Sequence, residues 1–308
     1  MQKNNSKINI VIFAFGFMGN SVFENILKNK YFEIKGIILP KNDPLYFDNI
    51  KKKKINKKIK ILYSDKKNKV HRFINKLKPD LVLVSTFNKV LDQKTLNLSK
   101  FINIHHGKLP KQKGRASINW AIIMGRKEIY ITIHEIITKL DSGKIITQKK
   151  IGIGKDDKYQ KIQNKINYYL KNNIGLIIKK YLYGNYILKR NNSLKETWNC
   201  SRNPEDNMIN FFDKKKKIYD LIRSSDNHRF GAFCFLKEKK ITILEANIKS
   251  RKKFEGIIPG RVVKLNQDGS IDCLCADGVL TITKISYNKK IMKPKKIIKS
   301  TRCTLLND

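Results

Sequence analysis

Short apolar runs recur along the first half of the chain, and amphipathic stretches separate them. The runs are rich in β-branched residues, as expected for strands that are buried on both faces of a sheet. Between them, apolar residues recur three and four positions apart, which is the spacing of a helix that buries one face. The pattern predicts strands at residues 8–15, 33–39, 59–63, 81–85 and 101–105, and helices at residues 21–30, 67–77 and 117–124.

Two later strands and a long helix continue this alternation, at residues 130–137, 145–151 and 156–183. Strands that alternate with helices favour a parallel sheet with right-handed crossovers. We therefore expect an α/β fold with a Rossmann-like parallel sheet. Ser21 is expected to cap the first helix, with Glu24 in capping-box position. Gly16 and Gly19 lack the full glycine pattern of dinucleotide sites, so a tight turn without a dinucleotide is favoured.

The pattern changes around residues 195–206, which are polar and rich in turn formers. A helix is predicted after them at residues 218–225, and then short alternating strands at residues 232–236, 240–246, 260–265, 270–274 and 279–284. Short strands separated by turns are typical of a small β-barrel, here OB-like. The 308 residues are enough for two domains. We predict a Rossmann-like domain at residues 1–204 and a C-terminal β-barrel domain at residues 205–308.

The net charge of +41 is high enough to attract nucleic acid. However, only ten of the 66 basic residues are arginine, and Lys, Ile and Asn are abundant throughout. AT-rich codons supply these three residues, so genome composition accounts for much of the charge. The lysine runs at residues 51–54 and 214–217 are interpreted as solvated faces. The charge therefore permits a nucleic-acid partner without requiring one.

The longest apolar runs are too short to span a bilayer, and no cleavage site follows the N-terminal residues. These features predict a cytoplasmic protein that does not contact a membrane. The five cysteines are odd in number and form no Cys-x-x-Cys pair, which favours reduced thiols.

Three residues in the middle of the chain are candidates for catalysis. Asn103 and His105 lie two positions apart in a predicted strand, so their side chains share one face. A neutral imidazole can take a proton from a nucleophile, and an amide can donate to an oxyanion. Asp141 follows 36 residues after His105 in a Leu-Asp-Ser-Gly turn, where its carboxylate would favour a protonated imidazole. The group suits acyl transfer from a carbonyl donor to an amine.

The residues alone leave other interpretations open. A histidine at a strand end is often structural, and an aspartate before Ser-Gly is often a turn former. His105 and the adjacent His106 face opposite sides of a strand and have no evident third ligand, so no metal site is predicted.

The run at residues 103–122, followed by the turn at Asp141, resembles the folate-dependent formyltransferases, whose hallmark is Asn-x-His, Leu-Pro, Arg-Gly and Asp-x-Gly. The resemblance implies 10-formyltetrahydrofolate as the formyl donor and co-substrate. It also implies that Asn103 steadies the tetrahedral oxyanion, that His105 deprotonates the amine and that Asp141 assists the proton transfers. The folate would then lie in a cleft whose residues include Thr86, Phe87, Val90, Leu109, Pro110, Leu140 and Gly143.

Two branches of that family differ in the amine that accepts the formyl group. Residues 114–120, 201–206 and 231–233 are similar to the sugar N-formyltransferases, notably the aminoarabinose-formylating domain. This similarity implies the amino group of a nucleotide-linked amino sugar as the acceptor. The alternative is initiator methionyl-tRNA, and a third interpretation is a degenerate RNA-binding module. The sequence leaves the oligomeric state open, with a homodimer among the alternatives.

Several positions depart from the family pattern. His106 stands where glycine is usual, Lys108 lies in an altered loop, and Ser117 replaces a proline. Lys113 replaces an arginine, and we expect it either to alter donor affinity or to extend its ammonium outward into solvent. The acceptor is expected to be selected by residues 40–58, residues 86–90 and the segment around Arg202.

Overall fold

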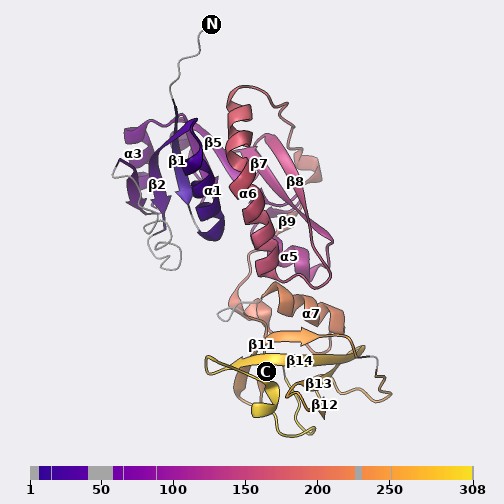
Figure 1. Cartoon of the computed structure of the whole chain (residues 1–308). Coiled ribbons are helices and arrows are strands. Elements are labelled where there is room, and N and C mark those ends of the chain that lie inside the picture. The colour runs from indigo at the N-terminus through magenta and orange to yellow at the C-terminus, as the bar shows by residue number, and fades with distance from the viewer. Residues whose placement is uncertain are drawn as a thin grey trace. The chain divides into compact units, whose positions relative to one another are not determined.

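The structure is a computed structural model that describes residues 7–14, 16–40, 58–64, 66–87, 89–225, 231–250 and 252–306. The chain folds into two compact units, coloured by residue number in Figure 1. The first unit comprises Met1–Gly114, Ile129–Ile151 and Gln163–Asn199, and the second comprises Arg115–Glu128, Gly152–Ile162 and Cys200–Asp308. The domain boundary predicted between residues 204 and 205 stays a prediction.

The first unit is built on a seven-stranded sheet with the order β3-β2-β1-β4-β5-β7-β8. Strands β1 to β5 are parallel, and β7 runs antiparallel to β5. The strands are β1 Ile8–Ala14, β2 Phe32–Leu39, β3 Lys60–Tyr63, β4 Leu81–Ser85, β5 Lys100–His106, β7 Glu128–Glu135 and β8 Ile145–Gly152. The helices are α1 Gly16–Lys28, α3 Lys67–Leu77, α4 Gln93–Leu96 and α6 Tyr159–Leu182, whose first turn lies in the second unit. The Rossmann-like parallel sheet is confirmed.

The central strands are buried because helices cover both faces of the sheet. Val11 and Phe13 of β1 pack with Val70 and Ile74 of α3 in one core cluster. The alternation of side chains along a strand turns the intervening Ile12 to the opposite face. Consecutive apolar residues in β1 and β4 are therefore the sequence signature of their central place in the sheet.

The first helix begins earlier than predicted. It starts at Gly16, so Ser21 lies inside the helix and its hydroxyl donates to the Phe17 carbonyl. The predicted cap and capping box are wrong. The physical reason is close packing at the turn, because a Cβ on Gly19 would lie 2.3 Å from the carbonyl carbon of Ala14. Glycine at this position lets the helix start directly after β1.

The second unit is a small antiparallel sheet packed against helices. Its strand order is β10-β11-β14-β13-β12, with β15 paired to β14. The strands are β10 Phe233–Leu236, β11 Lys239–Asn247, β12 Val262–Leu265, β13 Ile271–Cys275, β14 Gly278–Tyr287 and β15 Lys290–Met292, and the helices are α5 Ser117–Ile123 and α7 Lys215–Ser224. The predicted small antiparallel β domain is confirmed as a half-barrel, and β15 was not predicted.

A buried ionic network joins α7 to a segment from the middle of the chain. The Arg223 guanidinium donates to the Asp220 carboxylate and to the Asp157 carbonyl, each at 2.7 Å. All three residues are at most 4% exposed. Because a buried charge is costly unless it is paired, this network fixes the loop before α6 to the second unit.

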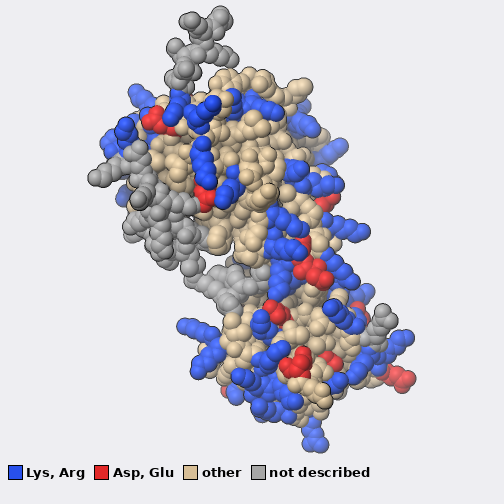
Figure 2. Space-filling view, viewed as in Figure 1, with Lys and Arg blue, Asp and Glu red and all other residues tan. Residues whose placement is uncertain are grey.

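Basic side chains are scattered over the visible face of each unit, and acidic side chains are few (Figure 2). The lysine run at residues 51–54 falls outside the described residues, as does the rest of the segment at 41–57. Among the helices that the structure describes, none has the length and apolar composition needed to cross a membrane. All five cysteines carry free thiols, and Cys234, Cys273 and Cys275 are buried in the second unit.

Candidate active site

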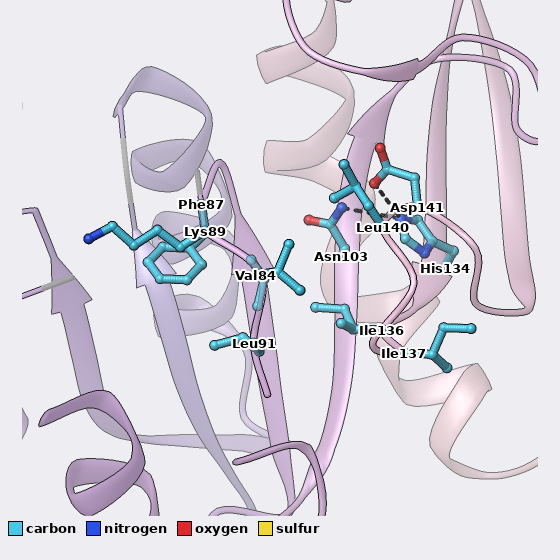
Figure 3. A pocket seen from close by; sticks show the side chains of 11 residues that line it. Val84, Phe87, Lys89, Leu91, Asn103, His134, Ile136, Ile137, Leu140 and Asp141 are labelled. Atoms are coloured by element: carbon cyan, nitrogen blue, oxygen red, sulfur yellow. Dashed lines mark hydrogen bonds and ion pairs between the residues drawn. The ribbon is translucent and has the colours of Figure 1, made fainter. Parts of the chain in front are cut away.

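The sheet topology brings the candidate catalytic residues to one place. β5 lies between β4 and β7, and the register pairs Asn103 with Val84 on one side and with His134 on the other. Asp141 lies in the turn that follows β7. Figure 3 shows Asn103, His134 and Asp141 directed toward one another. In open α/β sheets, ligands bind at this carboxyl end of the parallel strands.

The Asp141 carboxylate lies between two imidazoles. Its Oδ2 atom is 3.6 Å from Nδ1 of His105, and its Oδ1 atom is 3.6 Å from Nε2 of His134. The Gly114 backbone N–H donates to Oδ2 at 3.0 Å. All three side chains are nearly buried, with at most 7% exposed. The structure thus brings Asn103, His105 and Asp141 together, as the spacing predicts, and adds His134.

The hydrogen bonds of the two imidazoles assign a tautomer to each of them. Nε2 of His105 lies 2.7 Å from the Gln112 carbonyl oxygen, and a carbonyl only accepts, so this nitrogen carries the hydrogen. The lone pair of neutral His105 is therefore on Nδ1, toward Asp141. In His134, Nδ1 donates to the Glu135 carbonyl at 2.7 Å, and Nε2 can accept from the Asn103 amide at 3.1 Å. His134 thus orients Asn103.

Burial and charge set the ionisation of the site. Burial lowers the pKa of His105, and this effect outweighs the Asp141 carboxylate, which raises it. Burial raises the pKa of Asp141, but the adjacent His134 imidazole, the nearby His105 and the Gly114 N–H together lower it to about 2. At neutral pH the site therefore holds an ionised carboxylate beside a neutral imidazole, which is the state of a general base.

His106 points away from this group. Its Nε2 atom lies 2.9 Å from the Met18 sulfur, and burial lowers the pKa of His106 to about 4. His106, which stands where the family usually has glycine, is therefore a neutral residue that packs against Met18 of α1. Among the described residues, no group of three or more His, Cys, Asp or Glu side chains is arranged to hold a metal ion.

A pocket opens beside the catalytic group (Figure 3). Its walls are mostly apolar, and Asn103, His134 and Asp141 supply polar groups at one end. Of the residues expected to bind folate, three line this pocket, namely Phe87, Val90 and Leu140. The other lining residues are Val84, Lys89, Leu91, Ile136 and Ile137.

The remaining four residues expected to bind folate do not line this pocket. Thr86 follows β4 with a φ of 64°, and Leu109 is buried and joined to Pro110 by a cis peptide bond. Gly143 packs on β7, where a Cβ would lie 1.9 Å from the Glu135 carbonyl oxygen. Glycine here allows the Asp141 turn to lie against the strand. The proposed roles of all seven residues in donor binding stay predictions.

The Lys113 side chain does not extend into solvent. Its side chain is fully buried, and its ammonium donates to the Ser142 hydroxyl and to the Glu196 carboxylate, each at 2.7 Å. The expectation that it extends into solvent is wrong, because the Glu196 carboxylate and the Ser142 hydroxyl replace water around the ammonium. Lys113 also pairs with Trp198 in the short parallel ladder of β6 Lys113–Gly114 and β9 Trp198–Asn199.

The Arg202 segment belongs to the second unit. The Arg202 guanidinium donates to the Asp206 carbonyl and to the Asn207 side chain, each at 2.7 Å, and lies 5.1 Å from the Trp120 ring centroid. The Trp120 indole N–H donates to the Cys200 carbonyl. Trp120 and Arg202 thus make hydrogen bonds and a ring contact within the second unit, which accounts for a tryptophan and an arginine at these positions.

His134 is the site residue that the sequence analysis missed. The predicted alternation of its strand placed it on the same face as Thr132, but nothing in the sequence gave the register between this strand and β5. Thr132 lies opposite His105, and its hydroxyl donates to the Gly107 carbonyl. A polar residue on the buried face of an alternating strand was the available signal.

Comparison with known proteins agrees with this geometry. Residues 36–174 match the profile described as formyl transferase, and residues 202–302 match that of the formyl transferase C-terminal domain. The chain is 26% identical to the bifunctional polymyxin resistance protein ArnA of Wigglesworthia glossinidia brevipalpis, over 95% of this chain and 47% of ArnA. It is 25% identical to methionyl-tRNA formyltransferase of Malacoplasma penetrans (strain HF-2), over 84% of this chain and 80% of that protein.

The fold is similar to that of WlaRD, a sugar 3N-formyl transferase solved in the presence of dTDP and 5-N-formyl-THF. The TM-score is 0.65 at 20% identity, over 92% of this chain and 99% of WlaRD. The chain spans about half the length of ArnA. The two profiles together cover most of the chain, from the parallel sheet that carries Asn103 to the antiparallel sheet of the second unit. The chain therefore belongs to the formyl transferase family.

Proposed function

We propose that this enzyme transfers the formyl group of 10-formyltetrahydrofolate to a primary amine, and that the amine belongs to a nucleotide-linked amino sugar. The observation that carries the proposal is the neutral His105 beside the ionised Asp141, whose carboxylate lines the polar end of an apolar pocket together with Asn103. A base close to an amide donor is the arrangement that transfer of an acyl group to an amine requires.

The pocket suits a folate donor. Phe87, Leu91 and Ile136 offer apolar walls to flat rings, and the polar groups gather at one end, as in most ligand sites. When bound, the folate supplies the formyl carbon on its N10 atom. WlaRD was solved with a formylated folate, which supports the same class of donor for this chain.

Each side chain has a defined part in the transfer. The amine nitrogen forms a bond to the formyl carbon, and the bond between that carbon and N10 breaks. His105 takes a proton from the attacking amine at Nδ1 and returns it to the departing N10 nitrogen. Asp141 stabilises the imidazolium in between, since its Oδ2 atom faces Nδ1. The Asn103 amide, oriented by His134, donates to the formyl oxygen as negative charge develops there.

The acceptor proposal has support from relatives. Similarity to ArnA and to the fold of WlaRD extends over more than nine-tenths of this chain. The second candidate acceptor is initiator methionyl-tRNA, which the net charge of +41 and the relative in Malacoplasma penetrans favour.

One assay separates the two acceptors. The whole chain is incubated with 10-formyltetrahydrofolate and either a panel of amino-sugar nucleotides, including a dTDP-linked 3-amino sugar, or charged initiator tRNA. We expect the sugar amine to be formylated at a rate that depends weakly on salt. Formylation of the tRNA alone, falling steeply with salt through loss of phosphate contacts, would assign the enzyme to the second acceptor.

The controls are His105→Ala and Asp141→Asn in the same assay. Loss of a general base or of its charged partner costs about two to four orders of magnitude in rate. Both variants should retain the circular dichroism spectrum of the wild type. Full activity in either variant would contradict the proposed mechanism whatever the acceptor.

A further inference from the structure

The segment after α6 returns to the active site and crosses the turn that carries Asp141. We call residues 189–199 the strap. At its first end, Lys189 exchanges two backbone hydrogen bonds of 2.9 Å with Ile145. At its other end, β9 pairs with β6. The strap is thus attached on both sides of the turn within the first unit.

Asn191 of the strap holds the backbone of the turn. Its amide nitrogen donates to the Asp141 carbonyl at 2.8 Å and to the Gly143 carbonyl at 3.1 Å. The hydrogen bonds support a turn in which Asp141 has a φ of 48°, a left-handed conformation that glycine adopts freely and aspartate only occasionally. Residues of this kind persist only where the surrounding structure over-determines them.

The second half of the strap supports the groups that contact the catalytic side chains. The Thr197 hydroxyl accepts from the Gln112 N–H, and the Thr197 carbonyl accepts from the Lys113 N–H. Gln112 in turn presents its carbonyl to His105. Glu196 holds the Lys113 ammonium, which binds Ser142 in the turn. The positions of both His105 and Asp141 therefore depend on contacts with the strap.

We propose that Asn191 is a positioning residue, which through the Asp141 turn holds the carboxylate against His105. The inference rests on the proposed function, because it assigns the strap a part in the same proton transfer. Asn191 acts through the backbone of the turn and does not line the pocket. Asn191 is proposed to maintain the distance of 3.6 Å between Oδ2 of Asp141 and Nδ1 of His105.

The chain offers a matched control at the next residue. Asn191→Asp keeps the shape of the side chain and removes both N–H donors. Asn192→Asp makes the same change one position on, where the side chain is exposed and accepts from the Leu194 N–H, a role that a carboxylate keeps. Asn191→Leu removes the donors without adding a charge, and so separates loss of hydrogen bonds from a new anion.

The variants are assayed in the whole chain with the acceptor that the wild type formylates fastest. We expect Asn191→Asp and Asn191→Leu to lower kcat about 10- to 100-fold, as small misplacements of catalytic groups do. The KM for 10-formyltetrahydrofolate and the affinity for 5-formyltetrahydrofolate should stay within about twofold of the wild type. Asn192→Asp should match the wild type. Unchanged kcat in Asn191→Leu, or equal losses of kcat and folate affinity, would overturn the proposal.

A second readout does not depend on activity. The charged and titratable groups around His105 are Asp141, His134, Lys113 and His106, and of these the Asp141 carboxylate raises its pKa. In Asn191→Leu the carboxylate is released, so the pKa of His105 measured by NMR should fall below its wild-type value. If His105 titrates as in the wild type, Asn191 is not a positioning residue. A shifted titration in a protein that formylates neither acceptor would refute the proposed function, and would leave only the positioning of the Asp141 carboxylate by Asn191 standing.

Discussion

The carboxylate of Asp141 lies between two imidazoles that serve different purposes. His105 keeps a lone pair on the nitrogen that faces the carboxylate, so it can accept a proton. His134 uses both nitrogens in hydrogen bonds, to a carbonyl and to the Asn103 amide. In the proposed mechanism, His105 is therefore free for proton transfer, and His134 orients the Asn103 amide that faces the developing oxyanion.

The pKa shifts predict a pH profile. The proposed mechanism requires neutral His105, and burial lowers the pKa of His105 below the ordinary value of 6.5. We expect kcat/KM to rise with pH through a midpoint below 6.5. In Asp141→Asn the group that raises this pKa is lost, so the midpoint should move to still lower pH while the rate falls. A wild-type midpoint above 6.5, or an upward shift in the variant, would contradict this assignment.

The sequence was informative where chemistry depends on local spacing. Asn103 and His105 had to share a face because they lie two apart in a strand, and the structure places them so. His134 could not be found in this way because its contact with Asn103 depends on the register between two strands 31 residues apart. The burial of Lys113 was missed for a similar reason, since its partner Glu196 is 83 residues away.

Among the secondary-structure elements, the turn after β7 does most to place the catalytic carboxylate. It lies so close to the strand that only glycine fits at residue 143. The strap holds the turn from outside through Asn191. The position of Asp141 is thus fixed by close backbone packing on one side and by side-chain hydrogen bonds on the other.

Gly143→Ala tests the packing of this turn. The added Cβ would lie 1.9 Å from a backbone oxygen of Glu135, which has no rotamer to relieve the clash. We expect the turn to shift and the rate of formyl transfer to fall about 100-fold. The control is Gly152→Ala, because no atom lies within 4 Å of a Cβ at that position. Equal activity of the two variants would show that the turn tolerates displacement.

Elements with strong apolar patterns followed their periodicity, and the two-residue strands did not. The predicted bounds of α3 and β4 are those observed, since their apolar patterns are strong and turn formers flank them. β6 and β9 have two residues each and were not predicted. Their ladder lies beside the ion pair between Lys113 and Glu196. This is a tertiary contact, which a local sequence pattern does not predict.

At the scale of the whole molecule, the chain path interleaves the two units. The second unit takes Arg115–Glu128 and Gly152–Ile162 from the middle of the chain. Asn119 of α5 donates to the Ser224 carbonyl at the end of α7, and the Asp157 carbonyl binds Arg223. The second unit therefore depends on residues far from its main sequence block.

This arrangement predicts how a fragment behaves. A piece comprising residues 205–308 lacks α5 and Asp157, which leaves Arg223 without its carbonyl acceptor and one side of α7 uncovered. Loss of a buried hydrogen bond to a charged group costs about 1.5–3 kcal/mol, and the uncovered apolar surface adds to this. We expect the fragment to unfold at a lower urea concentration than the same sheet in the whole chain.

Tryptophan fluorescence cannot follow the fragment, because Trp120 and Trp198 lie outside it, so far-ultraviolet circular dichroism is the measurement. Arg223→Met in the whole chain is the comparison, since it removes this hydrogen bond together with the ion pair to Asp220 and leaves α5 in place. A fragment with the stability of the intact protein would show that a boundary at 204 separates two autonomous domains.

The interleaved path also bears on the order in which the protein is made. The first unit is complete in sequence once Asn199 has left the ribosome, but α5 has by then been synthesised without the helix that covers it. About 25 residues separate Asn199 from the end of α7, and at about 5–20 residues per second their synthesis takes on the order of 1–5 seconds. During that interval the apolar side chains of α5 are not covered by α7. A nascent chain stalled in this window is the form most open to chaperone binding.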